Sequence, residues 1–332
     1  MCSMEQRTTN LTFKNPLVIL LIAVVIIGIA FYVFQNKDQT VSSLVTQTPS
    51  HTETGSMNSE NPTYGHVHAL FRNPVDGVLL MGTHNGLFKS MNNGKTFTKV
   101  DVKGKVKEMD FMNFAYDQIN KILYAGGHDV GVIKSTDGGV TWTKTDDGIK
   151  GSDIHALAIN PLDSNRLYAF SVDNGVFGTK DGAKSWYRID DGPTNPSVRA
   201  FGYMGTANPM DRSMKTDMTT NIGYLWAGTG GGLYSSFACF CGWTKATGIS
   251  DNATIYTLAP DPVNRSVMFV GTKDGIYKTT DEGKSFSLIN KDIKDVASIV
   301  FDQTDSKMIF VVTANGVLYR TSDSGNAWSK VN

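Results

Sequence analysis

The chain has 332 residues, and its 31 basic and 31 acidic side chains give a formal net charge of zero at pH 7. This length suffices for one large domain with its own core and for additional segments. A neutral chain without a basic stripe is a poor binder of nucleic acid, which excludes that class of partner. The 3 cysteines, Cys2, Cys239 and Cys241, are too few for a disulfide framework.

The first feature along the chain is an uncharged segment of 18 residues, from Leu17 to Phe34 (LVILLIAVVIIGIAFYVF). It is long enough to cross the hydrocarbon core of a bilayer, and it lacks the cleavage site of a signal peptide. Arg7 and Lys14 precede it, so the positive-inside rule favours a short cytoplasmic tail, residues 1–16, and an extracytoplasmic C-terminal part. Residues 35–64 are rich in Ser, Thr, Asn and Gln and predict a flexible stalk. We therefore expect a single-pass protein of the cell membrane.

From residue 65 onward one motif recurs, Ser/Thr-x-Asp-x-Gly-x-Ser/Thr-aromatic, which we call the repeat box. Its copies are SMNNGKTF at 90–97, STDGGVTW at 135–142, TKDGAKSW at 179–186, TTDEGKSF at 279–286, TSDSGNAW at 321–328 and a copy at 236–243 that keeps only its ends. The closing aromatics are separated by 45, 44, 57, 43 and 42 residues. A period in the forties is typical of a propeller or a solenoid.

Each repeat unit contains four short segments of strand character. In 68–90 (HALFRNPVDGVLLMGTHNGLFKS) an apolar run, a turn with Asn and Pro, a second run, a Gly turn and a third run follow one another. A fourth run follows the box, and no unit shows a sustained helical period. Four strands in each of six units predict an all-β, six-bladed propeller over residues 65–332.

The repeat box resembles the Asp-box, or BNR repeat, of sialidase-like β-propellers. That superfamily also includes sortilin-type receptors, photosystem assembly factors and several glycoside hydrolases. The resemblance covers about residues 66–332. It implies the fold but not one function, because unrelated activities occur on this fold.

The box itself has a structural explanation. Its aspartate can accept hydrogen bonds from backbone N–H groups of its own turn, its glycine supplies a positive φ, and its aromatic packs between sheets. We assign this structural role to the box aspartates Asp137, Asp181, Asp281 and Asp323. In the copy at 236–243, Ala238 and Phe240 replace Asp and Gly, so a rebuilt turn is expected there. Cys239 and Cys241 in this copy form either a strained local disulfide or two free thiols.

Five histidines of the repeat region fall on one predicted face: His66, His68, His84, His128 and His155. By alignment, three of them begin the innermost strands of units one and three. The other two lie in the turns between the second and third strands of units one and two. In a propeller these segments emerge on the same face, opposite the repeat boxes. Histidine often serves binding or catalysis near neutral pH, so this face is the candidate ligand site.

The same alignment extends the candidate site around the axis. The positions equivalent to His68 are Met112, His155, Arg199, Tyr256 and Ser298. Because inner strands line the axial channel, we expect His68, His155, Arg199 and Tyr256 to converge at its mouth. Alternatively, the imidazoles only cap backbone groups at strand ends. A divalent metal held with Asp110 or Asp153 is chemically reasonable, but the spacing fits no known ligand signature. We therefore assign no metal ligand and expect no cofactor.

The resemblance also raises the question of glycoside hydrolysis. Sialidases use an arginine triad, a Tyr paired with a Glu and an Asp acid/base, and glycosidases in general need two facing carboxylates. The repeat region has only two glutamates, Glu108 and Glu282, and its FRNP sequence at 71–74 aligns with ordinary turns of other units. We assign no catalytic residue.

The longest interval between boxes, 57 residues against 42–45 elsewhere, places its extra length near 205–221, in a loop between the first two strands of unit four. Taken together, the sequence predicts a membrane-tethered, extracytoplasmic propeller that binds a protein or glycan ligand. The alternatives are a cell-surface glycoside hydrolase with a site unlike that of sialidases, and a metal-binding surface protein.

Overall fold

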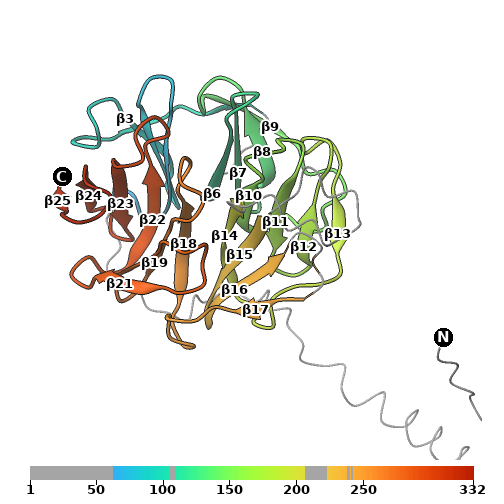
Figure 1. Cartoon of the computed structure of the whole chain (residues 1–332). Coiled ribbons are helices and arrows are strands. Elements are labelled where there is room, and N and C mark those ends of the chain that lie inside the picture. Colours follow the sequence, from blue (N-terminus) through green and yellow to red (C-terminus); the bar gives the residue numbers. More distant parts are fainter. Residues whose placement is uncertain (1–62, 105–109, 206–222, 238–239, 241) are drawn as a thin grey trace, which may run out of the picture. The chain divides into compact units, whose positions relative to one another are not determined.

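The computed structural model describes residues 63–104, 110–205, 223–237, 240 and 242–332. All of them lie in one compact unit, Met57–Asn332, and this unit is a six-bladed all-β propeller, as predicted (Figure 1). The predicted tail, membrane segment and stalk, residues 1–62, lie outside the described residues, as do Cys239, Cys241 and most of the long loop, residues 206–222. None of the described residues belongs to a helix long and apolar enough to cross a membrane.

Each blade contains four antiparallel strands that follow one another in the chain, from the axis outward. Blades 1 and 2 contain β1 (Val67–Arg72), β2 (Leu79–Thr83), β3 (Gly86–Ser90) and β4 (Thr98–Lys99), then β6 (Asp110–Asp117), β7 (Ile122–His128), β8 (Gly131–Ser135) and β9 (Thr141–Lys144). Blades 3 and 4 contain β10 (Ile154–Ile159), β11 (Leu167–Ser171), β12 (Gly175–Gly178) and β13 (Tyr187–Ile189), then β14 (Val198–Gly205), β15 (Gly223–Thr229), β16 (Gly232–Phe237) and β17 (Thr244–Lys245). Blades 5 and 6 contain β18 (Ile255–Pro260), β19 (Met268–Thr272), β20 (Ile276–Thr279) and β21 (Ser287–Asn290), then β22 (Val296–Phe301), β23 (Ile309–Thr313), β24 (Leu318–Thr321) and β25 (Ser329–Lys330).

Blade 2 has a fifth strand that the repeat pattern does not predict. Strand β5 (Lys103–Gly104) pairs in parallel with the outer strand β9. The chain therefore leaves blade 1 along the outer edge of blade 2, and the outermost strand of blade 2 is covered. Figure 1 shows the other outer strands, such as β13, β17, β21 and β25, at the periphery of the propeller.

The ring closes between the first and last blades without exchange of a strand. Inner strand β1 lies beside β22, and the backbone N–H of Val67 donates to the carbonyl of Ala314 at 3.0 Å. Arg72, in the FRNP turn, forms an ion pair with Asp302 at 2.5 Å, and its guanidinium lies 5.0 Å from the ring centroid of Phe310. The arginine of the FRNP sequence therefore joins blade 1 to blade 6.

The hydrophobic core is divided into clusters between neighbouring blades, and the box aromatics belong to them. Trp142 is fully buried and packs against Leu80 and Leu87 of the preceding blade. Trp186 packs in the same way against Tyr124 and Val132 of blade 2. The predicted packing of the aromatic between sheets is therefore observed, and it explains why the aromatic position is kept in every copy of the box.

The box turns have the predicted hydrogen bonds. The Asp137 carboxylate accepts from the backbone N–H groups of Val140 and Thr141, at 3.1 and 2.9 Å, and from the Ser135 hydroxyl at 2.7 Å. Equivalent bonds reach Asp181, Asp281 and Asp323. At the glycine position φ is positive throughout these copies, including Ala183 at 63°, so a residue with a Cβ is tolerated there at some conformational cost.

A β-bulge interrupts the first strand pair of every blade at the same place. The register skips one residue between β1 and β2, between β6 and β7 and in the four other pairs. The skipped residues are His68, Met112, His155, Arg199, Tyr256 and Ala297. Bulges re-aim side chains, and here all six lie at the same end of the inner strands. The expectation for blade 6 is therefore wrong by one residue: the position equivalent to His68 is Ala297 and not Ser298.

Candidate functional site

Three positions of the repeat supply a cluster of polar residues at one end of blades 1–3. The first is the residue at the start of the inner strand or just before it. The second is the bulged residue of the inner strand. The third lies at or just after the end of the second strand, opposite the first. In blade 2, for example, Asp110 and His128 are direct cross-strand partners. We call the set the histidine rim: His66, His68 and His84 of blade 1, Asp110 and His128 of blade 2, and Asp153 and His155 of blade 3.

Strand direction places the histidine rim on the face of the propeller opposite the repeat boxes. In four antiparallel strands the start of the first and the end of the second lie on one face. The turn between the third and fourth strands, which carries the box, lies on the other. All five histidines predicted to share a face do so, although His128 ends strand β7 instead of lying in the following turn.

The five imidazoles form a continuous row across the three blades. The ring centroids of His66 and His68 are 4.6 Å apart, and those of His68 and His84 are 4.5 Å apart. The row continues with 5.9 Å between His84 and His128 and 5.0 Å between His128 and His155. Such proximity of five basic side chains would be electrostatically unfavourable if all of them carried a positive charge at once.

His68 shows this effect most clearly. Burial of the ring lowers the pKa of His68 well below its usual range, and the neighbouring His66, His84, His128 and His155 lower it further. At pH 7 the His68 ring is therefore neutral and has one nitrogen lone pair to offer. Its Nε2 atom is buried and has no hydrogen-bond partner among the described residues.

Two carboxylates connect to the row through His128. Asp110 Oδ2 lies 2.7 Å from His128 Nδ1, and His84 Nε2 is 3.7 Å from the same oxygen. At the other end of the ring, His128 Nε2 lies 3.1 Å from His155 Nε2 and 3.9 Å from Asp153 Oδ1. His155 Nε2 is itself 3.1 Å from Asp153 Oδ1. The imidazole of His128 therefore has one carboxylate near each of its nitrogens.

Several of these side chains have ligand atoms close enough to share one metal ion. Among the described residues three such groups occur: His66, His68 and His84; His84, Asp110 and His128; and His128, Asp153 and His155. Within each group the possible ligand atoms lie within 4.8 Å of one another. The sequence spacing gave no such signature because two of the three groups combine residues of neighbouring blades.

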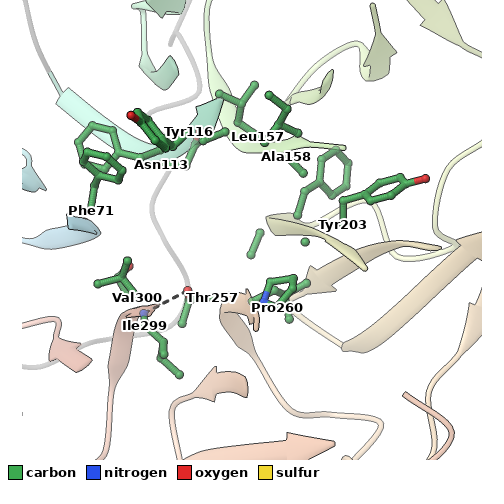
Figure 2. A pocket seen from close by; sticks show the side chains of 18 of the residues that line it. Phe71, Asn113, Tyr116, Leu157, Ala158, Tyr203, Thr257, Pro260, Ile299 and Val300 are labelled. Carbon is green, nitrogen blue, oxygen red and sulfur yellow. Dashed lines mark hydrogen bonds between the residues drawn. The ribbon is translucent and has the colours of Figure 1, made fainter. Parts of the chain in front are cut away.

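Arg199 and Tyr256 lie at the axial cavity. The Arg199 guanidinium is 5.7 Å from the centroid of the Tyr256 ring. Both residues line a cavity of about 340 Å³ together with His68 and with residues of all six inner strands. Figure 2 shows side chains such as Phe71, Leu157 and Val300 around this common space.

The predicted convergence of four residues on the axial cavity is correct for three of them. His155 does not line the cavity, because its ring is directed to Asp153 and His128. The cavity continues toward the repeat-box face, where Gln118 and Gln303 hydrogen-bond to each other. The predicted single ligand site thus divides into the histidine rim and the axial cavity, with His68 common to both.

The fold resembles propellers in larger proteins. A GH74 enzyme of Niastella koreensis aligns with a TM-score of 0.58 at 17% identity, over 80% of this chain and 45% of the enzyme. A GH74 xyloglucanase of Xanthomonas campestris gives 0.55 at 16% identity, over 80% and 47%. The extracellular domain of a putative hybrid two-component system of B. thetaiotaomicron gives 0.53 at 15% identity, over 81% and 33%. This chain therefore spans less than half the length of each, and likeness at this level shows the fold alone. The sequence matches no family model and no curated protein.

Proposed function

We propose that this chain is a membrane-tethered, extracytoplasmic binding propeller, and that the ligand of its histidine rim is a divalent transition-metal ion. The observation that carries the proposal is the triangle formed by His128 Nε2, His155 Nε2 and Asp153 Oδ1. Its sides are 3.1, 3.1 and 3.9 Å. Two nitrogens and one carboxylate oxygen at these separations match the face of a metal coordination shell.

The match follows from coordination geometry. Zinc binds imidazole nitrogen and carboxylate oxygen at about 2.0–2.2 Å with tetrahedral angles, which puts neighbouring ligand atoms roughly 3.3 Å apart. Two sides of the triangle, at 3.1 Å, are slightly shorter than this distance, and the third, at 3.9 Å, is longer. Two histidines and one carboxylate leave a fourth position for water or for a further ligand, as in sites where metal-bound water or substrate is held.

Asp110 supports the same interpretation from outside the coordination shell. Metal-bound histidines usually donate their second ring N–H to a carboxylate, which fixes the tautomer and orients the ring. The Asp110 carboxylate is placed to accept such a bond from His128 Nδ1 at 2.7 Å. His128 then carries its lone pair on Nε2, the atom that faces His155 and Asp153.

The ligand types favour a transition ion over calcium or magnesium. Imidazole suits Zn²⁺, Cu²⁺, Ni²⁺ and Fe²⁺, whereas Ca²⁺ and Mg²⁺ prefer oxygen ligands. Affinity at such sites generally rises to a maximum at Cu²⁺. We therefore use Zn²⁺ as the redox-inert probe and Cu²⁺ as the spectroscopic one.

The geometry gives less support to the hydrolase alternative. A glycosidase needs two carboxyl groups on either side of the scissile bond of its substrate. The two rim carboxylates, Asp110 and Asp153, instead lie at opposite nitrogens of the His128 ring. A protein or glycan ligand of the wider face stays compatible with metal binding, because the metal has an open position through which such a ligand can bind. The anchoring segment 17–34 would hold this face outside the membrane.

The test is zinc binding to the purified full chain, measured by calorimetry. Loss of an outer-shell partner costs about 10–100-fold in metal affinity, so loss of a direct ligand is expected to cost roughly 100-fold or more at this site. The variants are His155→Ala and Asp153→Asn. The matched control is Asp129→Asn, an exposed carboxylate beside His128 that bonds to the Ser152 hydroxyl and has a positive φ that Asn tolerates. Equal zinc affinity in the Asp153→Asn, His155→Ala and control proteins would refute the proposal.

A further inference from the structure

Blade 1 repeats the geometry of blade 2 with histidine at every position. His66 and His84 face each other as Asp110 and His128 do in blade 2. The backbone N–H of His84 donates to the backbone carbonyl of His66 at 3.1 Å. The bulged residue between them is His68. Three imidazoles therefore meet at one end of a single blade, and none of them belongs to the triangle of His128, Asp153 and His155.

The ligand atoms of these three histidines are close enough for one ion. Their available ring nitrogens lie within 4.8 Å of one another. The ring centroids are 4.5 Å apart for His68 and His84, and 5.6 Å apart for His66 and His84. Because their planes are tilted and not stacked, the rings can direct nitrogens to a common point.

Burial and access in this group fit a bound ion. His68 Nε2 is buried without a hydrogen-bond partner among the described residues, an arrangement that costs free energy unless something else satisfies the nitrogen. His66 is buried, His68 is half-buried and His84 is exposed to solvent. An ion can therefore enter beside His84 and be held by the two inner rings.

We propose that His66, His68 and His84 form a second metal site, made of imidazoles alone, for a borderline ion such as Zn²⁺ or Cu²⁺. The site extends the proposed function, but it shares no ligand with the first. A neutral three-imidazole set with an open position is typical of zinc bound by three histidines. It lacks the carboxylate that lets the first site hold harder ions.

Asp110 lies between the two sites and links them. Its Oδ2 atom is 2.7 Å from His128 Nδ1 and 3.7 Å from His84 Nε2. One negative charge close to a ligand of each ion reduces the repulsion between two dications at short range. The alternative grouping of His84, Asp110 and His128 around one ion is less favourable. The 2.7 Å between Asp110 Oδ2 and His128 Nδ1 is the distance of a hydrogen bond, and it is shorter than the roughly 3.3 Å between two ligand atoms of a tetrahedral metal ion.

The experiment counts zinc ions per full chain after gel filtration, by elemental analysis and calorimetry. We expect two ions in the wild type and one in the His66→Ala/His68→Ala variant. We also expect one ion in His84→Ala, which alters an exposed ring and serves as a second test if the buried double variant fails to fold. The Asp153→Asn/His155→Ala variant should keep one ion, and Cu²⁺ bound to it should show electron paramagnetic resonance coupling to three imidazole nitrogens.

The outcomes for the two sites can be told apart. A wild-type chain with one zinc ion that is lost only on changing Asp153 and His155 refutes the second site and leaves the proposed function intact. One ion that is lost only on changing His84 supports the second site and refutes the first. Two ions retained in His84→Ala also refute the second site. The Asp129→Asn control should hold two ions.

Discussion

Replacing Asp137 by alanine should destabilise the propeller without changing its affinity for metal. The carboxylate accepts bonds from the N–H groups of Val140 and Thr141 and from the Ser135 hydroxyl, at 2.7–3.1 Å. Each hydrogen bond contributes about 0.5–1.5 kcal/mol net, and water can reach this exposed turn and replace part of the loss. Three lost bonds near the lower end of that range predict a loss of about 1–3 kcal/mol in the free energy of unfolding.

The chain contains its own control for this change. In blade 1 the box has Asn92, whose Oδ1 accepts from the Thr96 N–H at 3.0 Å and from the Ser90 hydroxyl at 2.9 Å. Asp137→Asn retains such an acceptor and should lose less than about 1 kcal/mol, the net contribution of a single hydrogen bond.

The assay is urea unfolding of the full chain, followed by the fluorescence of its 5 tryptophans, together with zinc calorimetry on each folded variant. We expect a lower midpoint for Asp137→Ala and unchanged zinc affinity in both variants. An Asp137→Ala protein that unfolds at the wild-type midpoint but binds zinc more weakly would show that the box takes part in the site.

Three further predictions concern metal affinity, acid stability and topology. Asp110→Asn should weaken zinc binding by about 10–100-fold while the number of bound ions at saturation stays the same, because Asp110 orients His128 without binding the ion. Calorimetry measures this, and an unchanged affinity would contradict the role. Hydrogen bonds from the Ser285 side chain and N–H and from Thr279 lower the pKa of Asp281 from 3.8 to about 2. The folded pKa lies below the unfolded one, so this stabilisation is complete above pH 4 and is lost as the pH falls toward 2. The urea midpoint should therefore fall less steeply over that window in Asp281→Asn than in the wild type, and equal slopes would refute the assignment. In intact cells, protease should cleave residues after about 60 and spare the tail 1–16; protection of the propeller would refute the proposed topology.

The fold could be predicted from the sequence because the same local signals recur in each unit. Glycine with positive φ, an acidic acceptor and a buried aromatic such as Trp142 each have a local physical cause, so the six copies identify six blades. Strand β5 could not be predicted, because two residues that pair with the edge of the next blade carry no periodic signal of their own.

The grouping of the five histidines on one face could be predicted, since strand direction alone brings histidines at equivalent repeat positions together. The error at Ser298 arose where the markers of alignment are weakest. Gln303 occupies the position of Pro74, Pro161 and Pro262, so no proline marks the turn of blade 6. The bulge then decides which residue is displaced, and in blade 6 it is Ala297.

The division of the site into the histidine rim and the axial cavity could not be predicted. It depends on side-chain directions that the repeat pattern does not specify. His68 and His155 occupy equivalent bulges in blades 1 and 3, but His155 has Asp153 at 3.1 Å and His68 has other imidazoles as neighbours. The polar neighbours of each ring, and not the strand position alone, therefore determine which side chain lines the cavity.

The most direct measurement is anomalous X-ray scattering at the zinc absorption edge from crystals of the zinc-loaded chain. Metal binding at the histidine rim predicts a strong peak bounded by His128 Nε2, His155 Nε2 and Asp153 Oδ1, with distances of about 2.0–2.2 Å to each atom. A second peak is predicted among His66, His68 and His84. Crystals with a measured zinc content but with no anomalous peak beside His128, His155 and Asp153 would contradict the proposed function.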